Sequence, residues 1–157
     1  MKLLREYIRG LLTEQQPESE EEKLIRLFLS PAGSGAQALN LARSLEYGEL
    51  VTKFEPIIES IRAYIAEIDR LIDSAPSMEY DDFESQHFAL EERSVPEIKE
   101  LIEAEFGKQP RSFYVQFIES SDYIWYHGGP KVRHYNISSK GTSKAYYDAL
   151  KKWAGVP

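Results

Sequence analysis

The sequence predicts an α+β fold, in which a helical N-terminal half precedes a small antiparallel meander of the order α-β-β-β-α. The helical half is expected to consist of helical hairpins with one long helix. Apolar residues recur every three or four positions through most of residues 1–106, which is the period of a helix. After residue 111 the period changes to two, in aromatic and β-branched runs that alternate with turn residues, as strands do.

The first segment, residues 1–14, has the pattern of an amphipathic helix. Its apolar side carries Leu4, Tyr7, Ile8 and Leu11. A linker is expected at residues 15–18, because Pro17 and the glutamates beyond it interrupt the apolar pattern. The segment is therefore predicted to be a helix that stands separate from the helices after it.

Residues 19–75 are predicted to form a helical region. One helix covers about 19–29 and is broken by SPAGSG, and a second ends near Gly48. A long third helix carries an apolar stripe at alternating spacings of three and four, formed by Val51, Phe54, Ile58, Ile61, Ile65, Ile68 and Ile72. Two interpretations of this stripe stay open: it packs on neighbouring helices, or residues 51–72 form a self-association seam.

An acidic connector is predicted at residues 76–93, because this stretch is only weakly periodic and resembles a loop with short helical turns. Ser94 then opens the pattern Ser-Val-Pro-Glu, which is a capping box: the serine accepts from the Glu97 amide and the glutamate reaches back. A new helix is therefore expected to begin there and to end at Gly107. It opens a small α+β domain at residues 94–157.

Three strands are predicted inside that domain, at residues 112–118, 122–127 and 131–137. Their aromatic and β-branched runs are separated by ESS and GGP, which suit the turns of a meander. Thr142 or Ser143 is expected to cap a final helix. The inward side of that helix is predicted to carry Ala145, Tyr146, Ala149, Leu150 and Trp153.

The composition excludes several classes of protein. With 42% hydrophobic and 29% charged residues the chain has the makings of a folded domain rather than a disordered one. It has no cysteine, which excludes disulfides and thiolate metal sites. No apolar run approaches the roughly 20 residues that span a bilayer, so no membrane partner is expected. The acidic helix at 97–105 and the net charge of −7 argue against a nucleic-acid partner.

No catalytic constellation is recognisable in the sequence. The histidines, His87, His127 and His134, lack the spacing of metal ligands, so no metal site is predicted. Phosphate-binding loops, dinucleotide-binding glycine motifs and nucleophile elbows are also missing. The sequence therefore favours a binding protein over an enzyme, with no cofactor.

The stretch YHGGP at 126–130, with the residues up to 143, resembles the first motif of phage and toxin ADP-ribosyltransferases. The resemblance implies a strand on which Tyr126, His127 and Gly128 line an NAD pocket, with His127 contacting the nicotinamide ribose. The second motif and the catalytic glutamate of that family are not found in this sequence. In the other interpretation GGP is an ordinary turn and His127 is a sheet residue.

The segment MKLLREYIRGLLTE resembles the capsid-targeting peptides of proteins packaged in the heads of large contractile-tailed phages. Tyr7 and Ile8 match the aromatic and aliphatic pair of those peptides. Leu12, with Glu14, matches the hydrophobic-x-Glu site, after which the head-maturation protease would cut before Gln15. The same tripeptide pattern recurs elsewhere in the chain, mostly within predicted helices.

This resemblance implies a virion protein that acts by protein-protein interaction. Its partners would be phage head or core proteins and the maturation protease, and its locations the host cytoplasm and then the head. An ordinary first helix of the fold stays the alternative for residues 1–14.

Overall fold

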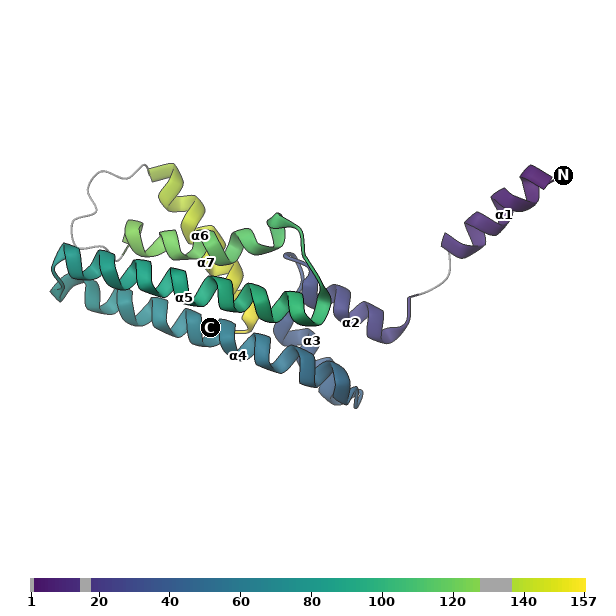
Figure 1. Cartoon of the computed structure of the whole chain (residues 1–157), viewed down its shortest axis with the longest axis horizontal. Coiled ribbons are helices and arrows are strands. Elements are labelled where there is room, and N and C mark those ends of the chain that lie inside the picture. Colours follow the sequence, from purple (N-terminus) through teal and green to yellow (C-terminus); the bar gives the residue numbers. More distant parts are fainter. Residues whose placement is uncertain (1, 15–17, 128–136) are drawn as a thin grey trace.

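The computed structural model describes residues 2–14, 18–127 and 137–157, with side chains at 2–8, 18–124 and 144–157. Within these ranges the chain is 85% helical, with seven α-helices and no strand (Figure 1). The predicted α+β fold is therefore wrong, and the described part of the chain is all-helical.

The first three helices lie close to their predicted positions. They are α1 (Lys2–Glu14), α2 (Glu20–Leu29) and α3 (Gly35–Ser44). The Ser19 hydroxyl accepts a hydrogen bond from the Glu22 amide at 3.2 Å, and the Ser34 hydroxyl accepts from the Gln37 amide at 3.1 Å. Both serines are N-caps, so these side chains set where α2 and α3 begin.

Two long helices lie side by side and form the largest elements of the fold (Figure 1). They are α4 (Gly48–Ser74) and α5 (Tyr80–Phe106), joined by the short 3-10 helix η1 (Ala75–Ser77). The predicted stripe of α4 is buried at Phe54, Ile58, Ile61, Ile65 and Ile68. Because these side chains are already packed within one chain, a self-association seam through 51–72 would require this core to open.

The continuous helix α5 corrects the prediction of a connector and of a new helix at Ser94. Phe83, His87 and Leu90 are buried at spacings of four and three, so the acidic stretch has a helical face after all. The proline of the supposed capping box, Pro96, lies inside the helix. It is exposed, so water can reach the carbonyl one turn before it, which the ring leaves without a donor. The predicted end at Gly107 is confirmed.

The predicted strands are also replaced by helices. The first two lie in α6 (Arg111–His127), and residues 128–136, with most of the third, lie outside the described residues. Phe113, Phe117, Ser120 and Ile124 are buried at spacings of four, three and four, the period of a helix. A small polar residue at one inward position hid this period, and the strand preference of aromatic residues is too weak to decide the conformation.

The last helix, α7 (Ile137–Ala154), begins earlier than the predicted cap at Thr142 or Ser143. Its buried residues include Tyr147, Leu150 and Trp153, whereas Ala145 and Ala149 are exposed. The buried face is therefore rotated from the predicted one. α7 packs on α6 rather than on a sheet, so the side of α7 that is buried is the side that contacts α6.

An aromatic junction joins the two ends of the bundle. The ring of Phe28 on α2 stacks on Phe54 of α4, with centroids 4.2 Å apart, and lies 5.1 Å from Trp153 of α7. The Trp153 indole N–H donates to the Phe28 carbonyl at 3.0 Å. Arg62 of α4 donates from Nε to the Ala154 carbonyl at 2.9 Å. These contacts fasten the end of α7 to α2 and α4.

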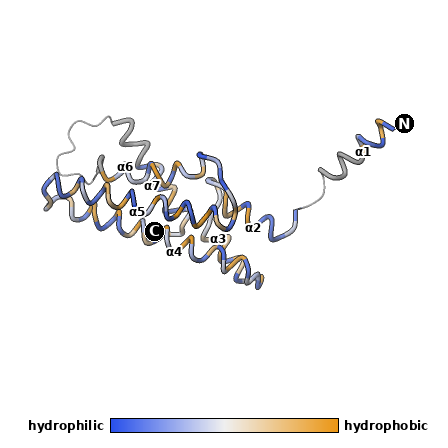
Figure 2. The backbone as a smooth tube through the Cα atoms, in the orientation of Figure 1, coloured by the Kyte–Doolittle hydropathy of each residue, from blue (hydrophilic) through white to orange (hydrophobic). Residues whose placement is uncertain are grey.

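Hydrophobic and hydrophilic residues alternate along the long helices (Figure 2), as expected for helices with one face in a core. Among the residues described, no helix combines the length and the apolar character that crossing a membrane requires.

Candidate functional site

The apolar side of α1 is exposed to solvent. The exposed fractions are 81% for Leu3, 55% for Leu4, 66% for Tyr7 and 46% for Ile8. Figure 1 shows α1 standing apart from the helices that form the core. A helix that leaves several large apolar side chains in water is typical of a docking element.

The predicted cleavage residues lie at the other end of α1. The backbone helix includes Leu11, Leu12 and Glu14, whose side chains are outside the described set, and Gln15 lies outside the described residues altogether. The hydrophobic-x-Glu tripeptide is thus the last turn of α1. Cleavage after Glu14 stays a prediction.

A polar cluster is built into the interface of α4, α5 and α6, and comprises Tyr64, His87, Glu91, Ser120 and Asp122. The Tyr64 hydroxyl donates to the Phe117 carbonyl at 3.0 Å, and the Ser120 hydroxyl donates to the same carbonyl at 2.9 Å. Burial raises the pKa of Tyr64 to about 12, so this phenol stays neutral at physiological pH.

His87 and Glu91 lie one turn apart on α5 within this cluster. His87 is only 2% exposed, and its Nε2 lies 4.0 Å from a carboxylate oxygen of Glu91. Burial lowers the pKa of His87 and raises the pKa of Glu91. Both shifts favour the neutral form of each group, so burial weakens any ion pair between them.

Asp122 on α6 has the largest carboxyl shift in the described structure. Burial, followed by the negative charges of Glu119 and Glu91, raises its pKa to about 6. The cluster can therefore take up a proton near neutral pH. Among the described residues no group of three or more histidine, aspartate or glutamate side chains is arranged to hold a metal ion.

An exposed aromatic residue lies on the outer side of α5 beside this cluster. Phe88 is 61% exposed and borders a cavity of about 280 Å³. The lining residues include Glu84, Ser85, His87 and Glu91. The sequence prediction missed this surface because it assigned the stretch to a loop.

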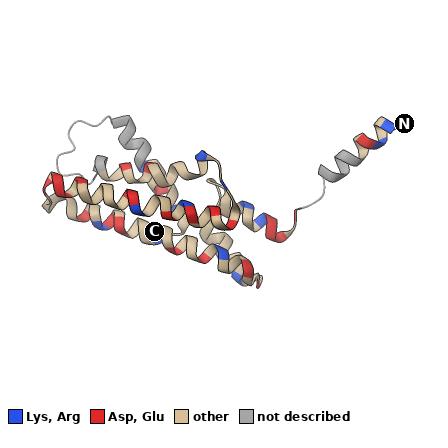
Figure 3. Cartoon of the chain, in the orientation of Figure 1, with Lys and Arg blue, Asp and Glu red and all other residues tan. Residues whose placement is uncertain are grey.

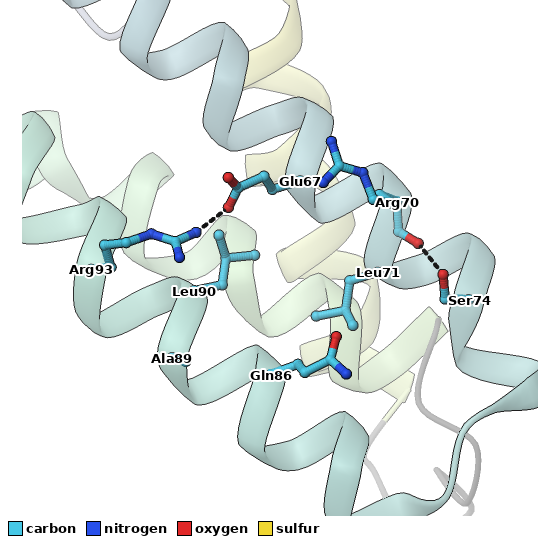
Figure 4. Close-up of a pocket in the computed structure, with 8 residues that line it drawn as sticks. All are labelled: Glu67, Arg70, Leu71, Ser74, Gln86, Ala89, Leu90 and Arg93. Atoms are coloured by element: carbon cyan, nitrogen blue, oxygen red, sulfur yellow. Dashed lines mark hydrogen bonds and ion pairs between the residues drawn. The ribbon is translucent and has the colours of Figure 1, made fainter.

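A second cavity, of about 340 Å³, lies between α4 and α5 (Figure 4). Glu67 of α4 and Arg93 of α5 form an ion pair across it, while Leu71 and Leu90 lie between the helices. The Ser74 hydroxyl donates a hydrogen bond to the Arg70 carbonyl one turn earlier, at 2.9 Å. Because Glu67 and Arg93 form an ion pair across this cavity, they link α4 to α5.

The residues suggested for NAD binding do not lie on a strand. Tyr126 and His127 form the end of α6, with side chains outside the described set, and Gly128 lies outside the described residues. The strand that the resemblance implies at Tyr126 and His127 is therefore wrong. No observation on the described residues favours NAD binding.

Comparison with protein-family models, with curated proteins and with solved structures finds no match to this chain. The features that bear on function are therefore those of its own structure: the exposed face of α1, the largely buried polar cluster and the acidic surface around Phe88.

Proposed function

We propose that the protein is a phage virion-associated protein, directed to the head through α1, and that it acts by binding other proteins. The observation that carries the proposal is the exposed apolar face of α1, on a helix that stands apart from the folded core. The similarity of residues 1–14 to capsid-targeting peptides supplies the kind of partner, a head or core protein.

The energetics of α1 support a docking role. An isolated helix of 13 residues is marginal in water, because nucleating a helix is costly and no packing repays it. Burying a large apolar side chain contributes about 1.5–3 kcal/mol. A partner that covers Leu4, Tyr7 and Ile8 would bury the apolar side chains that the bundle leaves exposed, and it would thereby stabilise the helix.

Packaging of a fusion protein tests the targeting step. Residues 1–18 fused to a fluorescent protein should enter the heads of the phage that encodes this chain. Leu4→Ser with Ile8→Ser should abolish entry, because the apolar face is lost. Entry of the double variant at the level of the unchanged fusion would refute the proposal.

In the full chain, Leu4→Ser with Ile8→Ser should also prevent packaging, and Leu45→Ser is the control there, since Leu45 is 46% exposed, as Ile8 is, but lies beyond α3 rather than on α1. The full chain carrying Leu45→Ser should be packaged normally. The intact mass of protein recovered from heads reports on processing. A chain that begins at Gln15 supports cleavage after Glu14, and a chain that retains Leu4 contradicts it.

A further inference from the structure

The acidic surface around Phe88 has the composition of a docking site for a basic helix. On α5, Glu84 and Ser85 precede Phe88 by one turn, and Glu91 and Glu92 follow it by one turn. Glu84 and Glu92 are exposed, and Glu91 is partly buried. We call these five residues the Phe88 face. Figure 3 shows how strongly acidic residues predominate on α5.

The described part of α1 carries a small excess of positive charge beside an apolar side. Leu4 and Ile8 lie one turn apart on its exposed apolar side, with Tyr7 beside them. Arg5 lies one turn before Ile8 and, like Lys2, is exposed. Glu6 is exposed too, but it lies two residues before Ile8 and therefore on another side of the helix. The same chain thus carries an apolar helix with a small excess of basic residues and an acidic aromatic face, and both are exposed.

We propose that α1 of one copy docks on the Phe88 face of a second copy. Leu4 and Ile8 would cover the exposed ring of Phe88, and Arg5 would lie among the glutamates that flank it. Opposite charges at an interface raise the rate of encounter and fix the orientation of the partners. An anionic membrane is a poorer binding partner for α1, because its negative surface would repel Glu20, Glu21 and Glu22 at the start of α2.

The proposed contact sets the kind of assembly. Because α1 and the Phe88 face are different patches, the contact is heterologous, and successive copies add head to tail. One side of this contact is a single helix of 13 residues, about 20 Å long, so we expect a smaller buried area than the ~1,200 Å² at which stable interfaces begin. Association is therefore weak and reversible, and it competes with any other partner of α1.

A paramagnetic label on one copy tests this contact directly. The chain has no cysteine, so Ala89→Cys gives a single nitroxide position at an exposed site of α5 that is next to the Phe88 face but not part of it. The labelled, isotopically unlabelled copy is mixed at high concentration with a ¹⁵N-labelled wild-type copy. The amide signals of residues 2–8 in the ¹⁵N copy should broaden. Arg5→Glu in that copy should remove the broadening, and Glu84→Lys with Glu92→Lys in the spin-labelled copy should restore it.

The control is Lys152→Glu in the ¹⁵N copy, which makes the same change of charge at an exposed position on α7 and should leave the broadening intact. The proposal is overturned if the signals of residues 2–8 do not broaden in the mixture, or if Arg5→Glu has no effect on the broadening. It is also overturned if broadening is seen only in a separate sample in which one molecule carries both the nitroxide and the ¹⁵N label. Head packaging of the α1 fusion does not involve the Phe88 face, so that proposal and this one fail separately.

Discussion

At the scale of single residues, the first residue of α3, Gly35, lies directly against the buried side chains of α4 and α7. A Cβ atom on Gly35 would lie 2.6 Å from the ring of Trp153 and 2.7 Å from Cδ1 of Ile58. Both neighbours are buried in the core, so neither can move aside freely. The absence of a side chain at Gly35 therefore allows α3 to approach α4 and α7.

We predict that Gly35→Ala lowers the free energy of unfolding by about 1–3 kcal/mol, because the added methyl group overpacks the junction. Urea denaturation measures the change. Gly48→Ala is the control: no atom lies within 4 Å of its added Cβ, and the variant should be stabilised by about 0.4–1 kcal/mol. Equal effects at both glycines would mean that Trp153 does not pack against α3.

The proton affinity of Asp122 leads to a prediction about pH. The folded state raises this pKa from the ordinary 3.8 to about 6, so it binds the proton more tightly than the unfolded chain does. Asp122 therefore stabilises the fold at low pH, and this contribution is lost as the pH rises through about 6. Urea denaturation of Asp122→Asn should show a weaker gain in stability than wild type between pH 7 and pH 4.5.

The comparison between variant and wild type isolates Asp122. Burial lowers the pKa of His87, which acts in the opposite direction in both proteins. Asp82→Asn, an exposed change on the same helix as His87, should keep the pH dependence of the wild type. Identical pH profiles for Asp122→Asn and wild type would show that folding does not raise the pKa of Asp122.

At the scale of elements, the sequence predicts the first four helices because their apolar residues repeat at helical spacing and proline and glycine residues interrupt the pattern between them. It does not predict the part of α5 before Ser94, nor α6, whose inward positions include polar residues, His87 and Ser120, so that the helical period is incomplete. Ser94 matches a cap in sequence, but tertiary packing carries the helix through it. The exposed face of α1 was accessible to sequence reasoning, whereas the polar cluster and the Phe88 face were not.

The separateness of α1 has a measurable consequence. Deletion of residues 1–14 should change the free energy of unfolding by less than about 1 kcal/mol, which corresponds to a shift in Tm of less than about 4 °C. The reason is that Leu4, Tyr7 and Ile8 are exposed and contribute little to the core. Thermal melting followed by circular dichroism at low protein concentration measures it, and a loss of several kcal/mol would place α1 in the core.

At the scale of the whole molecule, the end of α7 returns to the beginning of the bundle. Trp153 contacts Phe28 of α2, and it also lies within 6.3 Å, between ring centroids, of Phe113 and of Phe117 on α6. Helices from both halves of the chain thus share one aromatic core. We therefore expect the described helices other than α1 to unfold together.

We predict that Trp153→Ala lowers the free energy of unfolding by about 3–5 kcal/mol, the usual cost of removing a buried aromatic side chain. The remaining transition should stay single, with far-UV circular dichroism and tyrosine fluorescence coinciding. Lys152→Ala, an exposed change one residue earlier, is the control and should stay within about 0.5 kcal/mol of wild type. Two separate transitions in Trp153→Ala would mean that the two halves of the chain fold independently.

The junction at Phe28 also determines how the molecule would respond to force. Tension applied through α1 enters the folded body at Ser19 and passes along the single helix α2. At the far end of α2, Phe28 is held by Phe54 and by the indole of Trp153, so the pull reaches the aromatic junction within one helix. The opposite end of α4 and α5, where η1 joins the two helices, takes no part in this junction. A molecule tethered by its N-terminal helix would thus bear strain at its aromatic junction, while its polar cluster and Phe88 face stayed relaxed.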